Sequence, residues 1–133
     1  MTLRNNKVSS EELQLHLINF RLCDETILYI GKVEKQFLSI RLDQFFYYKI
    51  GRRSPHKGGY WLKCLDNLNQ LYVHLIPTNN SHDIEERMLQ SFMNNVSKVS
   101  RMRLIDKELP LPFANLQLRP GMIKKHGLQN HYS

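Results

Sequence analysis

The stretch ILYIGKVEKQFLSIRLDQF, residues 27–45, passes from one periodicity to another. Its β-forming residues end on Tyr-Ile-Gly-Lys, residues 29–32, where the glycine terminates a predicted strand. Apolar residues then recur at helical spacing over residues 37–48, with Arg41 on the flank of the apolar stripe. We therefore predict a strand, a turn and a helix that carry Tyr29, Lys32 and Arg41.

Alternating patterns predict further strands on both sides of this stretch. Leucines alternate with polar residues from Leu13, and the phase changes at residues 17–18, which predicts a bulged strand over residues 13–22. Before this strand, Ser-Ser-Glu-Glu at 9–12 could also start a short helical turn at the end of the loose N-terminus. Residues 26–30 and 71–75 are predicted as strands, and helices are predicted over residues 37–48, over 60–68 and onward from residue 84.

The size and composition favour one intracellular domain. The chain has 133 residues, of which 41% are hydrophobic, and this is enough for one compact core. We predict a single domain over residues 1–133, with a loose N-terminus at 1–10 and a basic tail at 117–133. No apolar run approaches the ~20 residues of a membrane span, and no secretory signal is visible, so we expect a soluble, cytoplasmic protein. Cys23 and Cys64 lack paired spacing and are expected to be buried free thiols.

The charge distribution points to a polyanionic partner. The formal net charge is +7, and no acid occurs between Asp43 and Asp66, a segment that also holds six aromatic residues. A solvated loop between two helices explains this segment equally well. If the segment and the tail bind nucleic acid, the residues in contact with it are Arg52, Arg53, Lys57, Lys63, Lys124 and Lys125.

One acidic residue stands out in the helix that follows residue 84. Glu85 lies near the middle of the apolar side of that helix, where a carboxylate costs free energy unless it is paired or bound to a cation. An ion pair with Arg41 would account for it. Phosphodiester hydrolysis would also account for it, because that chemistry uses a carboxylate for a divalent metal, a cation at the phosphate, and a hydroxyl or imidazole as proton acceptor. No Walker loop, nucleophile elbow or HExxH sequence is present.

Four short motifs occur in the order found in a known nuclease family. They are YIGK at 29–32, LSIRL at 38–42, IEERML at 84–89 and PFAN at 112–115. Together, over residues 13–116, they resemble the motifs of the GIY-YIG nucleases. The resemblance implies an α/β (α+β) fold with a small three-stranded antiparallel sheet flanked by helices.

The resemblance also implies an activity and roles for particular residues. It implies hydrolysis of DNA with one Mg²⁺ or Mn²⁺ bound by Glu85. Tyr29 would position or activate water, and Arg41 would stabilise charge on the phosphorane. The residues that would complete the site are Lys32, beside the phosphate, His56, in the glycine-rich loop, and Asn115, which would brace the site.

The first signature of the family, Gly-Ile-Tyr, is missing from this chain, and LHLINFR stands in its place. Depending on the length of the hairpin, either His16 falls at the tyrosine position and can serve as the base, or Ile18 does and the base is lost. We predict a metal-dependent endonuclease. The alternative is a catalytically inactive GIY-YIG-like module that binds nucleic acid or a protein partner. An RNA-binding domain unrelated to nucleases would require the order of the motifs to be coincidental.

Overall fold

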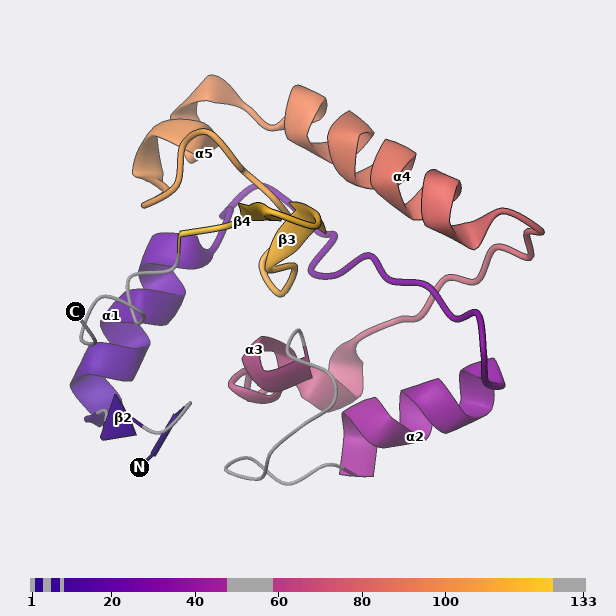
Figure 1. The fold of residues 1–133 in the computed structure, drawn as a ribbon. Coiled ribbons are helices and arrows are strands. Elements are labelled where there is room, and N and C mark those ends of the chain that lie inside the picture. Colours follow the sequence, from indigo (N-terminus) through magenta and orange to yellow (C-terminus); the bar gives the residue numbers. More distant parts are fainter. Residues whose placement is uncertain (1, 4–5, 8, 48–58, 126–133) are drawn as a thin grey trace.

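The computed structural model describes residues 2–3, 6–7, 9–47 and 59–125 (Figure 1). Within these ranges helices predominate, and they are α1 (Ser10–Phe20), α2 (Leu38–Tyr47), α3 (Gly59–Lys63), the 3₁₀ turn η1 (Leu68–Gln70), α4 (Ser81–Asn95) and α5 (Lys98–Arg103). Two short antiparallel pairs accompany them, β1 (Thr2–Leu3) with β2 (Asn6–Lys7) and β3 (Gln117–Arg119) with β4 (Met122–Ile123). The class is therefore mixed helix and small sheet, as in an α+β fold.

The first predicted strand is wrong, because residues 13–22 lie mostly in α1. Ser9 caps this helix: its side chain accepts a hydrogen bond from the Glu12 amide, and the Glu12 carboxylate accepts one from the Ser9 amide. Leu13, Leu17 and Phe20 then share one helical face and pack into the core. The capping box and the i, i+4, i+7 apolar spacing outweigh the local alternation of leucines.

The other two predicted strands form no sheet within the described ranges. Residues 26–30 have no regular secondary structure, and the segment predicted to pair with them is helical. They bond the C-terminal arm instead, where the Ala114 amide donates to the Leu28 carbonyl at 2.9 Å. Residues 71–75 also have no regular secondary structure and are largely exposed, with Tyr72 90% accessible. The residues that the structure describes therefore do not form the three-stranded antiparallel sheet expected from the sequence.

The helix predictions are closer to the structure. The helix predicted over 37–48 is α2, and the helix predicted from residue 84 is α4, which begins three residues earlier after the Pro-Thr-Asn-Asn turn. The helix predicted over 60–68 is shorter, because α3 ends at Lys63 and a separate 3₁₀ turn follows. In the part of the chain that the structure describes, no helix has the length and apolar character needed to cross a membrane.

An irregular arm, residues 109–115, forms the centre of the core. Every residue from Leu109 to Asn115 is buried. Leu111 joins the cluster of α4, and Phe113 joins Phe20 of α1 and Trp61 of α3 in a second cluster. In Figure 1 the arm leads from α5 into the β3–β4 hairpin beneath α4. The PFAN motif, residues 112–115, therefore lies within the core.

Candidate functional site

Three segments that are distant in the sequence bring polar side chains together. Tyr29 and Lys32 lie on the extended segment before α2, Arg41 on α2 and Glu85 on α4. The Arg41 guanidinium hydrogen-bonds the Tyr29 side chain, and the Lys32 ammonium lies 4.0 Å from Oε2 of Glu85. Four of the residues predicted from the sequence to form one site are therefore neighbours.

An aromatic contact fixes the Tyr29 ring. The ring packs against Phe45 of α2 with centroids 5.3 Å apart, and the Arg41 guanidinium lies 5.5 Å from the Phe45 centroid. Gly31 is required here because the Tyr29 ring folds back over it. A Cβ atom at position 31 would lie 2.5 Å from Cε1 of Tyr29. The Tyr-Ile-Gly sequence is therefore a packing unit that presents the tyrosine hydroxyl to Arg41.

The site keeps the Tyr29 hydroxyl protonated. Burial raises the pKa of Tyr29, and the Glu85 carboxylate raises it further, against the opposing effect of Arg41. A phenol with a raised pKa carries its proton at neutral pH. Tyr29 is therefore suited to donate or accept a hydrogen bond, and not to serve as an anionic base.

Burial also affects Glu85, whose side chain is 24% exposed. Desolvation raises the pKa of this carboxyl group, and the Lys32 ammonium offsets part of the effect. Lys32 also contacts a second carboxylate at closer range, since its Nζ lies 2.9 Å from Oε1 of Glu34. Glu85 is thus a partly desolvated carboxylate that a cation would stabilise in the ionised form.

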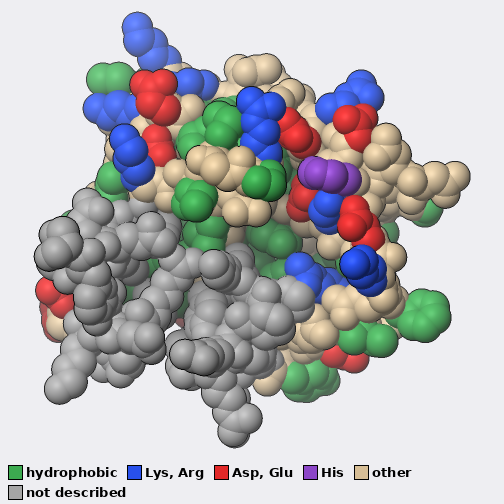
Figure 2. Space-filling model, viewed as in Figure 1, with side chains coloured by type: hydrophobic (Ala, Val, Ile, Leu, Met, Phe, Trp, Pro, Cys, Tyr) green, Lys and Arg blue, Asp and Glu red, His purple; other side chains and the backbone are tan. Residues whose placement is uncertain are grey.

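A hollow of about 270 Å³ opens beside this cluster. Its lining includes the side chains of Lys32, Glu34, Lys35 and Arg41. Figure 2 shows basic and acidic side chains gathered with a histidine on this face of the molecule. Because its lining includes three cationic residues and one acidic residue, the hollow favours an anionic ligand.

Asn115 ties the tyrosine segment to the core. Its side chain is 6% exposed and bonds both backbone groups of Ile30: Oδ1 accepts from the amide at 2.9 Å, and Nδ2 donates to the carbonyl at 2.7 Å. The side-chain amide of Asn115 thereby makes the two hydrogen bonds that a neighbouring strand would otherwise make with Ile30. Since Ile30 is flanked by Tyr29 and Gly31, this contact sets the position of the tyrosine.

Replacing Asn115 with leucine is expected to destabilise the fold by about 3 kcal/mol, because two buried backbone groups of Ile30 lose their partners. Urea denaturation of the variant measures this loss. Asn94→Leu, on the exposed side of α4, is the matched control and is expected to change stability little. A loss for Asn115→Leu no larger than that of the control would contradict the bracing role.

His16 lies apart from these residues. It is on the core-facing side of α1, with its ring 5.4 Å from that of Phe20. Burial lowers the pKa of His16, and Glu12 opposes this shift. None of its contacts with the residues that the structure describes involves Tyr29, Arg41 or Glu85. Ile18, the other residue considered for this position, is exposed on the same helix.

The predicted nucleic-acid contacts separate into three groups. Lys124 is only 4% exposed, and its ammonium donates to the carbonyls of Pro112 and Phe113 at 3.1 Å each, so its assignment to a basic surface is wrong. Lys63 is partly buried and donates to the carbonyl of Phe46, whereas Lys125 is exposed. The contacts that lie outside the described ranges are Arg52, Arg53 and Lys57. His56, which was predicted as part of the catalytic site, lies outside these ranges as well.

Two residues near the site were not singled out from the sequence. Glu34 accepts hydrogen bonds from Lys32 and from the Ser81 hydroxyl, at 2.9 and 3.1 Å. His82 is close enough to Glu34 and Glu85 to lower the pKa of both. The spacing of three between His82 and Glu85 on one helix is a signal that could have revealed the histidine. Glu34, on an irregular segment, has no comparable sequence signal.

The arrangement unites a half-buried carboxylate, two cations and a protonated tyrosine beside an open hollow. These groups can bind an anion such as a phosphodiester and can hold a cation beside it.

No protein-family model, no curated protein and no solved structure matches this chain.

Proposed function

We propose that this chain is a metal-dependent endonuclease of the GIY-YIG type that hydrolyses DNA phosphodiester bonds. The observation that supports this most is the convergence of Tyr29, Lys32, Arg41 and Glu85 from three separate segments. The order of the four motifs also supports the proposal, and the residue roles are those that the resemblance to the family implies. It does not depend on the three-stranded sheet, which the described residues do not form.

The side chains of the site divide the chemistry between them. Arg41 and Lys32 bind the phosphate and neutralise the charge that grows on it as water attacks, which is worth a few kcal/mol for each well-placed cation. The Tyr29 hydroxyl, held against Arg41, orients the phosphate or the water by hydrogen bonding. Asn115 binds the backbone of Ile30 and so holds the neighbouring Tyr29 in position between α2 and α4.

The donor set at Glu85 fits Mg²⁺ or Mn²⁺. Mg²⁺ binds through one or two carboxylates and keeps several waters, so it needs no cage of protein ligands. Among the described residues, no group of three or more His, Cys, Asp or Glu side chains could hold a metal ion, and Glu85 is the carboxylate whose charge raises the pKa of Tyr29. When bound, the ion would supply an activated water and neutralise charge on the phosphate.

An inactive binding module is the second candidate, and the position of His16 favours it. The imidazole that could replace the missing tyrosine of the first signature packs on Phe20 and contacts none of the four site residues within the described ranges. A module of this kind would keep the cationic hollow and bind nucleic acid without cutting it.

Cleavage of supercoiled and branched DNA distinguishes the two candidates. With Mg²⁺ or Mn²⁺ the nuclease proposal predicts nicked and linear products that disappear when EDTA is added. Absence of products with either metal, together with DNA binding that weakens as salt rises, would refute the nuclease proposal and support the binding module.

A further inference from the structure

Glu34 links the tyrosine segment to the start of α4. Its Oε1 accepts one hydrogen bond from the Lys32 ammonium at 2.9 Å and one from the hydroxyl of Ser81 at 3.1 Å. Ser81 is the first residue of α4 and lies one helical turn before Glu85. A single carboxylate oxygen therefore fixes Lys32 relative to the helix that carries Glu85.

The Lys32 ammonium lies between two carboxylates and is closer to one of them. Its Nζ is 2.9 Å from Glu34 and 4.0 Å from Glu85, the outer limit of an ion pair. A lysine stem has four rotatable bonds, so a shift of about 1 Å would bring the ammonium into direct contact with Glu85. The contact with Glu34 opposes that shift.

The position of Lys32 matters for any cation that uses Glu85. An ammonium in direct contact with a carboxylate occupies the space of a metal ion and repels the ion, because both carry positive charge. Held by Glu34, the same ammonium remains at the edge of the hollow, where it can meet a phosphate.

We infer that Glu34 is a positioning residue that holds Lys32 away from Glu85 and so keeps the Glu85 carboxylate open to a divalent cation. This inference rests on the proposed function. It assigns Glu34 a role that does not require contact with DNA, the metal or the reacting phosphate.

Titration of the full chain with Mn²⁺ alone, followed by the loss of the free-ion electron paramagnetic resonance signal, tests this role. Glu34→Gln is expected to weaken Mn²⁺ binding about tenfold, because the released ammonium moves onto Glu85. Adding Lys32→Met to Glu34→Gln is expected to restore binding to the level of Lys32→Met alone. Glu108→Gln, which removes an exposed acid, controls for the change in net charge, and circular dichroism checks folding.

The outcomes separate the inference from the proposed function. A wild-type affinity in Glu34→Gln, or a tenfold loss that persists when Lys32 is also removed, would overturn the positioning role while leaving the metal site in place. Absence of Mn²⁺ binding by the wild type would instead overturn the metal-dependent function, and this inference with it.

Discussion

Glu85→Gln is expected to reduce DNA nicking in Mg²⁺ by about 10³-fold or more, because the amide keeps the shape of the side chain but removes the charge that would bind the metal. Single-turnover nicking of supercoiled DNA measures the rate. Since Glu85 is partly buried and its pKa is raised by desolvation, the substitution is expected to maintain or slightly increase stability. Lost activity with retained stability would identify a functional carboxylate.

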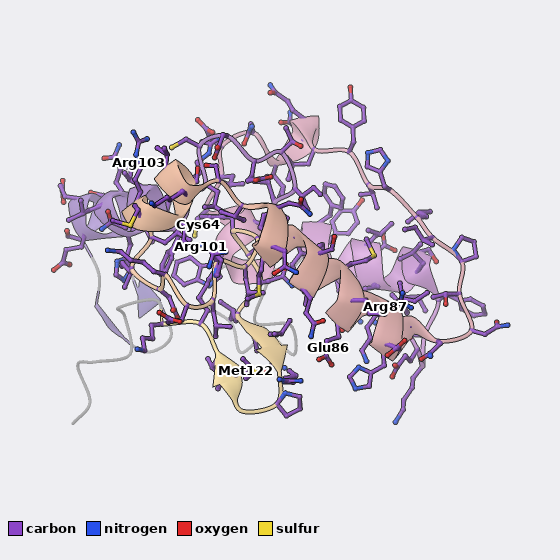
Figure 3. The ribbon with its side chains drawn as sticks, turned by 90° about the horizontal axis from the view of Figure 1, so that it is seen from above. Cys64, Glu86, Arg87, Arg101, Arg103 and Met122 are labelled. Atoms are coloured by element: carbon purple, nitrogen blue, oxygen red, sulfur yellow. The ribbon has the colours of Figure 1, made fainter. Side chains whose placement is uncertain are left out.

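The adjacent residue provides a matched control. Glu86 is next in the helix but projects toward the β3–β4 hairpin (Figure 3), where its Oε1 lies 3.2 Å from the Arg119 guanidinium. Glu86→Gln removes the same charge from the same turn of α4 without reaching Lys32. Its nicking rate is expected to stay within about twofold of wild type, because Glu86 is as buried as Glu85 but pairs with Arg119 instead of Lys32. Equal losses in both variants would contradict the assignment of Glu85.

Lys124 is expected to make stability rise with pH. Burial lowers its pKa from 10.5 to about 7, against the opposing charge of Asp106. Between these values the unfolded chain binds the proton more tightly than the folded chain, so raising the pH removes a penalty on the folded state. The free energy of unfolding is expected to increase by about 3 kcal/mol between pH 7 and pH 10. Below the lower pKa, the folded state carries the full cost of burying the charged ammonium.

Comparison with Lys124→Met isolates this effect from other titrations. The free energy of unfolding of wild type minus that of the variant, measured in urea, is expected to increase by about 1.4 kcal/mol per pH unit in the middle of this window. Lys125→Met is the matched control, because the adjacent lysine is exposed. A difference that does not change with pH would show that the ammonium of Lys124 is not desolvated.

Sequence reasoning identified much of the candidate site because its residues are tied to local patterns. Gly31 follows Tyr29 at a strand-like end, Arg41 lies on the flank of an amphipathic helix, and Glu85 interrupts an apolar stripe. Each is a departure from the surrounding pattern, and α2 and α4 form where that pattern predicts them. Asn115, which is predicted to brace the site, hydrogen-bonds both backbone groups of Ile30.

The strands were less predictable because short alternating runs also fit helices. In residues 13–20 the leucines satisfy a period of two, whereas Leu13, Leu17 and Phe20 satisfy a helical period, and the Ser9–Glu12 capping box favours the helix. That change removes His16 from the predicted position of a base. It also leaves residues 26–30 to pair with the arm at Ala114.

The position of Lys124 depends on long-range contacts that a sequence window does not contain. Gly121 adopts a positive φ of 86° and turns the chain back, and the Lys124 amide then donates to the Leu116 carbonyl at 2.8 Å. The side chain enters the core and meets the carbonyls of Pro112 and Phe113. From sequence alone the same lysine resembles a surface residue of a basic tail.

Whether Arg41 and Glu85 act on the same phosphate is tested most directly by the single-turnover nicking rates of Arg41→Met, Glu85→Gln and the double variant. Groups that act as one unit in a transition state lose most of their effect when either is removed. We therefore predict that the double variant is no more than a few-fold slower than the slower single variant. Losses that multiply in the double variant, or nicking rates equal to wild type in all three, would contradict a single site.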